Sequence, residues 1–171
     1  MNIQTIALLI LVPLLMWRVY ARLKRMMARQ QSVMSRHWTG LAVFTAMVLL
    51  PCSELVTQQP ASLGWLAVGT AAGIAYAIWG LRRTRYEITP EGYFFTPNAR
   101  LGMLVAMLFV GRIVYVGLEI FVNQGTANTL PRFTDSPLTL VCLGVFAGYF
   151  GAYSAGMLRW RFAIKKAAPK L

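Results

Sequence analysis

Five apolar stretches divide the chain, and we predict that each crosses a lipid bilayer as a helix. They cover residues 3–20, 39–56, 64–81, 101–123 and 137–158. A membrane-spanning helix needs about 20 mainly apolar residues, since the hydrocarbon core is about 30 Å thick. No polar block between the stretches is long enough to build a second core, so residues 1–171 are expected to form one domain. The pattern therefore predicts an all-α membrane bundle.

The longest polar interruption has the pattern of a β-hairpin. Arg85–Thr89 reads as a strand, Pro90-Glu91-Gly92 has turn chemistry, and Tyr93–Thr96 is rich in aromatic residues. Proline early in a turn with glycine after it is typical of a tight connection between two strands. We expect a small hairpin over residues 84–97, between the third and fourth spans.

A second polar segment, residues 21–38, follows the first apolar stretch. Leucine and methionine recur there at helical spacing, with basic residues on the other side. The pattern favours an amphipathic helix at the membrane surface or an extension of the first span.

Basic residues fix the predicted orientation. Lysine and arginine number 17, against 5 acidic residues. Of the 17, 15 lie in residues 18–36, in residues 82–100 or after residue 158, and five single crossings put these regions on one side. The positive-inside rule makes that side cytoplasmic, with the N-terminus outside and the C-terminus inside. Because orientation in the membrane explains the excess of basic residues, we expect no nucleic acid partner. Lipid head groups or a protein partner should contact the following basic residues: Arg22, Lys24, Arg25, Arg29, Arg82, Arg83 and Arg85.

Arg112 is the most informative single residue, because it lies near the middle of the fourth apolar stretch. Helical spacing places Tyr115 and Glu119 on the same face. A charge at that depth costs about 2.5–3.5 kcal/mol or more unless a partner or water satisfies it. At 1.5 Å per residue, Glu54 in the second span reaches a similar depth, so we expect an Arg112–Glu54 bridge. This cluster would either lock two helices together or line an outward-facing cavity for an ion, a proton or a small anion.

Two cysteines, Cys52 and Cys142, fall at comparable depths in the outer half of the predicted bundle. They would either form a redox pair that holds a disulfide or passes electrons, or be buried separately as small apolar side chains. No cluster of cysteine and histidine suggests a metal site, and no motif for a nucleophile, a phosphate or a dinucleotide is present. We therefore expect no cofactor, and the sequence gives little support to an enzyme.

Small residues recur along the third and fifth apolar stretches. Such faces allow helices to approach closely, within one bundle or across a homodimer. The glycines concerned are Gly69, Gly73, Gly80, Gly144, Gly148 and Gly151.

The layout of these features resembles that of a known family. An opening span precedes a basic segment, Glu54 follows Pro51 late in the second span, RYEITPEGYFF forms the hairpin, and Arg112 lies in the next span. In these respects the chain resembles the CcdC-like family of small bacterial membrane proteins, associated by name with cytochrome c biogenesis. The resemblance implies an inner-membrane location and a role near redox or cytochrome assembly, and it assigns no catalytic residue.

Two functional hypotheses follow. The first is a non-enzymatic accessory or assembly protein of the bacterial inner (cytoplasmic) membrane, whose basic cytoplasmic face binds lipid or a partner. The alternative is a small transporter or a thiol–disulfide conduit that uses the Arg112, Glu54 and Glu119 cluster or the cysteine pair.

Overall fold

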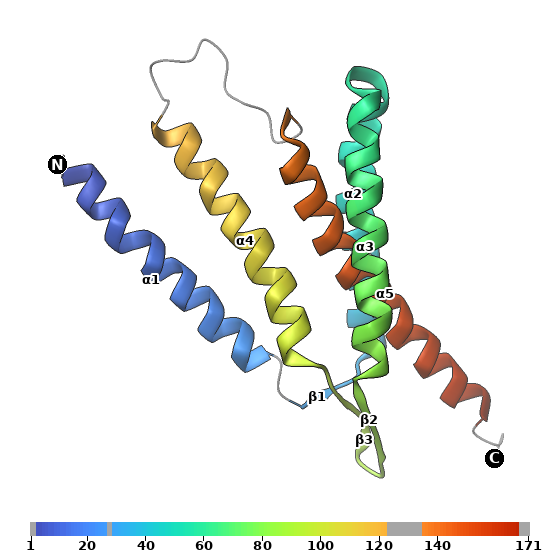
Figure 1. Ribbon diagram of the computed structural model, residues 1–171. Coiled ribbons are helices and arrows are strands. Elements are labelled where there is room, and N and C mark those ends of the chain that lie inside the picture. The colour runs from blue at the N-terminus through green and yellow to red at the C-terminus, as the bar shows by residue number, and fades with distance from the viewer. Residues whose placement is uncertain (1–2, 27–28, 123–134, 168–171) are drawn as a thin grey trace.

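The computed structural model describes residues 3–26, 29–122 and 135–167, and this part of the chain is mainly helical (Figure 1). Its α-helices are α1 (Ile3–Met26), α2 (Met34–Gln58), α3 (Leu63–Arg82), α4 (Ala99–Val122) and α5 (Pro137–Ala167). Its short elements are β1 (Gln30–Gln31), β2 (Arg85–Thr89), β3 (Gly92–Thr96) and the 3-10 turn η1 (Pro60–Ser62).

Four of the described helices, α2 to α5, are long and apolar enough to cross a membrane, which makes the chain a membrane protein. Large apolar side chains on them face outward, as lipid contact requires: Leu50 is 71% exposed and Val68 is 62% exposed. The crossing of the membrane by α1 stays a prediction, and so do the count of five spans and the orientation.

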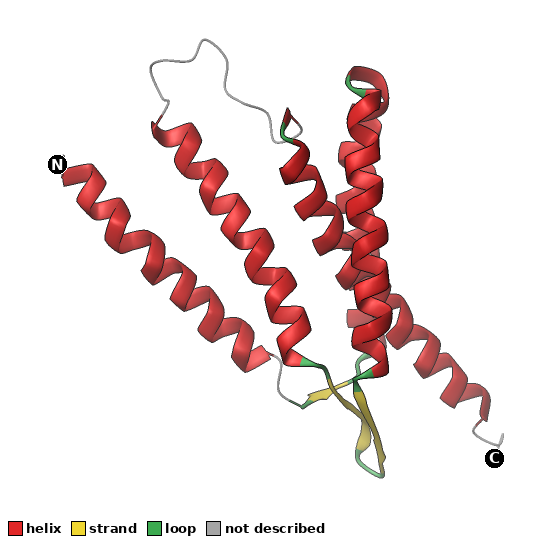
Figure 2. Ribbon diagram, viewed as in Figure 1, coloured by secondary structure: helices red, strands yellow, loops and turns green. Residues whose placement is uncertain are grey.

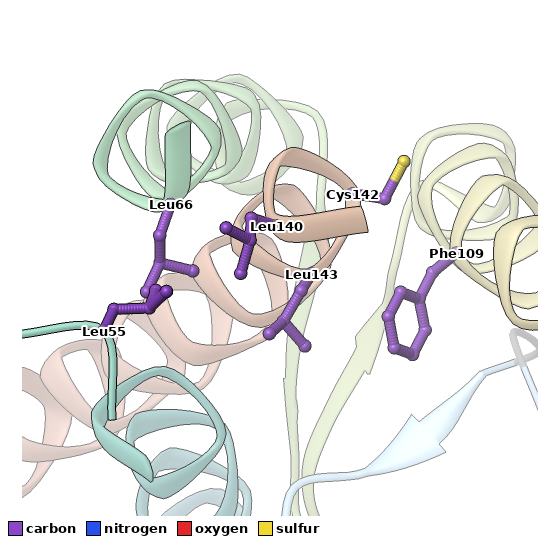
Figure 3. Packing of buried hydrophobic residues seen from close by; sticks show 6 residues of the cluster. All are labelled: Leu55, Leu66, Phe109, Leu140, Cys142 and Leu143. Carbon is purple, nitrogen blue, oxygen red and sulfur yellow. The ribbon is translucent and has the colours of Figure 1, made fainter. Parts of the chain in front are cut away.

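Helix α5 lies at the centre of the bundle, where it packs against α2, α3 and α4. Figure 3 shows Leu140 and Leu143 of α5 on the side of Leu55 and Leu66, which come from α2 and α3. Phe109 of α4 belongs to the same buried cluster and lies on the other side of α5. Because α5 lies between them, α2 and α4 are not close neighbours.

The closest helix pair is α3 with α5, and glycine makes that approach possible. A Cβ atom at Gly69 would lie 2.5 Å from the carbonyl oxygen of Val141, and one at Gly148 would lie 2.5 Å from that of Thr70. Contacts this short with a backbone atom leave no room for any side chain. The predicted glycine faces thus meet each other inside one chain, and they are not free to form the homodimer interface considered above.

The strands form one antiparallel sheet in the order β1–β3–β2, at one end of the helices (Figure 2). Strands β2 and β3 form a hairpin between α3 and α4, with Pro90 and Glu91 between the two strands. Proline fixes a negative φ, so the positive φ that the tight turn needs falls on Gly92, at 139°.

Residues 21–38 do not form one helix. Helix α1 extends the first apolar stretch to Met26, as one of the two alternatives predicted, but β1 pairs with β3 before α2 starts at Met34. The Ser32 N–H then donates to the Tyr93 carbonyl oxygen at 2.8 Å. The reason lies in the tertiary structure. The open edge of β3 provides this segment with backbone hydrogen bonds, and these favour a short strand over an isolated amphipathic helix.

Candidate functional site

One face of the sheet is fixed to the bundle by aromatic and cationic contacts. Alternation along the strands places Tyr86, Tyr93 and Phe95 on the same face. The ring of Trp160, near the end of α5, lies 4.7 Å from the Tyr86 ring and 6.4 Å from the Tyr93 ring. The Arg161 guanidinium stacks on Tyr93 at 3.9 Å.

The length of α5 makes this attachment possible. Its 31 residues extend about 46 Å at 1.5 Å per residue, well beyond a hydrocarbon core of about 30 Å. The C-terminal turns of α5 extend beyond the other helices (Figure 1), and Trp160 and Arg161 in this part of α5 contact the sheet.

The opposite face of the sheet is closed by Arg29. Its Nε donates to a Glu87 carboxylate oxygen at 2.9 Å, and its guanidinium lies 4.2 Å from the centre of the Phe94 ring. Both side chains of this ion pair are about half-exposed, so it adds no more than about 1 kcal/mol. It nevertheless holds the chain just before β1 in register with the hairpin.

Between the sheet and the bundle lies a cavity of about 270 Å³. Six elements and the short connections beside them contribute to it: α1, β1, α2, β3, α4 and α5. Its polar wall includes Arg36 and His37, and the His37 Nε2 shares a 2.9 Å hydrogen bond with the Ser32 hydroxyl. The complete lining is Leu23, Gln30, Gln31, Val33, Arg36, His37, Phe95, Pro97, Asn98, Gly102, Tyr149, Phe150 and Tyr153.

Arg36 gives the lining of this cavity a positive charge. No carboxylate belongs to the lining, and within the described part of the chain the Arg36 side chain has no hydrogen-bonded or ion-paired partner. Such a site favours an anion.

The basic residues predicted to contact lipid or a partner lie around the same end of the molecule. Those whose side chains are described and exposed are Arg22, Lys24, Arg29, Arg82, Arg83 and Arg85. The side chain of Arg25 lies outside the described residues.

On the hairpin, burial beside Trp160 raises the pKa of Tyr86 above its usual value of 10.0, so its phenol is neutral at physiological pH.

Among the described residues, Arg112 is hydrogen-bonded to two hydroxyl groups at the start of α5 and to no carboxylate. Its Nε donates to the Thr139 hydroxyl at 2.9 Å and its Nη2 donates to the Ser136 hydroxyl at 2.8 Å. The expected ion pair with Glu54 is absent from the contacts of the described residues, because α5 separates α2 from α4. Ser136 and Thr139 were not predicted from the sequence. Their spacing of three residues at the start of the fifth span, which places both on one helix face, was the signal that could have identified them.

Tyr115, another member of the predicted cluster, packs its ring 5.0 Å from the Arg112 guanidinium and is 57% exposed. Glu119 is exposed one turn further along α4, and Glu54 is half-buried on α2.

Cys52 and Cys142 are both free thiols. Cys142 is buried in the central cluster, on the side of α5 where Phe109 of α4 lies (Figure 3). Cys52 is half-buried on α2 and packs against the same cluster. Their use as a redox pair stays a prediction.

Together these features define a helical membrane protein with a small β-sheet fixed over a positively charged cavity at one end of the bundle. The family model described as CcdC protein matches residues 2–166, and the chain therefore belongs to the CcdC family, as the resemblance indicated. No curated protein and no solved structure gives a significant match.

Proposed function

We propose that this protein is a non-enzymatic accessory protein of the bacterial cytoplasmic membrane, and that its sheet docks a partner protein on the cytoplasmic side. The supporting observation is the free edge of β2. In the order β1–β3–β2 this strand pairs on one side only within the described residues, so alternate residues direct backbone N–H and C=O groups away from the sheet. An extended segment of a partner can pair with such an edge and add a strand.

The chemistry of the edge favours an acidic partner segment. Arg82, Arg83 and Arg85 are exposed at the start of β2, while the Glu87 carboxylate is already paired with Arg29. Ile88 is 65% exposed near the tip of the hairpin, an unusual place for a large apolar residue outside the lipid. An aliphatic anchor beside a basic rim is suited to a partner strand with acidic and apolar residues.

Rigid attachment supports docking over a merely structural role for the hairpin. An isolated two-stranded hairpin is only marginally stable in water. Here Trp160 and Arg161 clamp one face, Arg29 covers the other, and β1 adds a third strand. The edge of β2 is therefore preorganised, which reduces the entropy lost on binding. The resemblance to proteins associated with cytochrome c biogenesis makes an assembly complex of that kind the setting we expect.

Site-specific photo-crosslinking in intact cells tests the proposal. A photoreactive amino acid at Ile88 is compared with the same group at Ile78, an exposed isoleucine on the apolar helix α3. We expect one defined protein adduct from position 88 only, with its contact mapped to an acidic extended segment. Arg85→Glu should lower the yield at least fivefold, and Arg85→Lys should preserve it.

Three outcomes would each reject the docking function. They are equal adducts from both positions, no protein adduct from position 88, and a crosslinking yield that Arg85→Glu does not change. Orientation is tested separately with a cysteine at Glu91, in the hairpin turn, in a chain whose two native cysteines are replaced. A membrane-impermeant maleimide should label it only after the cells are opened, and labelling in intact cells would place the sheet outside.

A further inference from the structure

We propose that the cavity under the sheet binds the phosphate head group of an anionic phospholipid from the leaflet at this end of the bundle. This site is distinct from the β2 edge, and it does not depend on the docking of a partner.

The arginine in the cavity wall provides the first argument. Arg36 lies there without an ionic partner in the described ranges, and the His37 ring lies beside it as a further hydrogen-bonding group. A phosphate oxygen would accept charge-assisted hydrogen bonds from the Arg36 guanidinium, and these are stronger than hydrogen bonds between neutral groups.

Size and wall chemistry favour a lipid over a free phosphate. A volume of 270 Å³ equals that of about nine water molecules, at about 30 Å³ each, and it greatly exceeds one phosphate group. The remaining wall is largely apolar, with Leu23, Val33, Phe95 and Phe150. A phosphate bonded to glycerol and the first carbons of acyl chains matches both parts of the wall.

The position of the cavity fits the head-group region of a bilayer. Its lining comes from the start of α2, the start of α4 and the basic end of α1, all next to the sheet. Trp38, beside His37, is 52% exposed, and Trp79, near the end of α3, is 42% exposed. Tryptophan is enriched at the membrane–water interface, and these exposed rings favour a position of this end of the bundle in that region.

Native mass spectrometry of the full chain tests this site. The protein is released from nanodiscs that contain equal amounts of phosphatidylglycerol and phosphatidylcholine, and the retained lipid is counted. We expect one phosphatidylglycerol to be retained in preference, and Arg36→Ala to reduce its retention at least fivefold. Arg159→Ala, which removes an exposed arginine outside the lining, is the matched control and should retain the lipid.

A second variant, Val33→Trp, fills the cavity without removing charge and should also lose the lipid. Circular dichroism and thermal unfolding confirm that each variant is folded. Retention unchanged in Arg36→Ala and in Val33→Trp, or lost equally in Arg159→Ala, would overturn the proposal. Displacement of the lipid by millimolar glycerol 3-phosphate would also overturn it, because the ligand would then be a soluble phosphate compound.

Discussion

The close approach of α3 and α5 can be tested by adding a single methyl group. In Gly69→Ala the new Cβ would lie 2.5 Å from the Val141 carbonyl oxygen and 2.9 Å from the Val141 Cα. Ordinary contacts begin at 3.4 Å. The obstacle is backbone on the facing helix, which cannot rotate away as a side chain can. The two helices would have to separate by most of an ångström.

The expected magnitude follows from two opposing effects. Overpacking of a close-packed contact costs about 1–3 kcal/mol. Replacing glycine by alanine inside a helix gains up to about 1 kcal/mol in helix propensity. Gly117→Ala, on α4, carries the propensity gain alone, because no atom lies within 4 Å of the Cβ it would add. Comparison of the two variants removes the propensity effect and leaves a destabilisation of about 1–3 kcal/mol for Gly69→Ala.

Unfolding in mixed micelles measures this difference. Titration with sodium dodecyl sulfate can be followed by the fluorescence of Trp65 and Trp79, both on α3. Every 1.4 kcal/mol changes the folded-to-unfolded ratio about tenfold, so the expected shift of the midpoint is readily resolved. If Gly69→Ala is as stable as Gly117→Ala, or more stable, the expected clash between the added methyl group and the Val141 backbone is refuted.

Three further predictions concern other contacts. Thr139→Val should destabilise the protein by about 1.5–3 kcal/mol, since it removes a hydrogen bond to a charged group, and the loss should shrink in an Arg112→Met background when a double-mutant cycle is measured. Trp160→Ala should accelerate amide exchange in β2 and β3 while α3 and α5 keep their protection, because the sheet depends on that ring and the helical core does not. A membrane-permeant maleimide should label half-buried Cys52 several times faster than Cys142, which is only 6% exposed.

Each of these predictions has an outcome that contradicts it. Additive free energies for Thr139→Val and Arg112→Met would show that the two side chains are not coupled. Faster exchange throughout the helices of Trp160→Ala would show that the sheet and the core form one cooperative unit. Equal labelling rates for the two cysteines would contradict the burial of Cys142 in the central cluster.

The positions of the helices and the hairpin follow from local properties that the sequence alone determines. In lipid every backbone polar group must be satisfied within its own segment, so a long apolar run has to form a helix. The hairpin is equally local, because Pro90 and Gly92 specify the turn between the two strands. The helices coincide with the five apolar stretches, although α1, α2 and α5 run at least five residues beyond them.

Only the tertiary structure decided which elements meet. Arg112 was expected to pair with Glu54 because both lie at similar depth, but depth does not give the order of helices around a bundle, and α5 lies between them. Strand β1 exists because β3 presents an edge that no local pattern announces. The cavity, assembled from six elements, was likewise invisible in the sequence. Helix formation depends on each segment's own backbone, whereas these contacts depend on how every helix is rotated and which neighbour it faces.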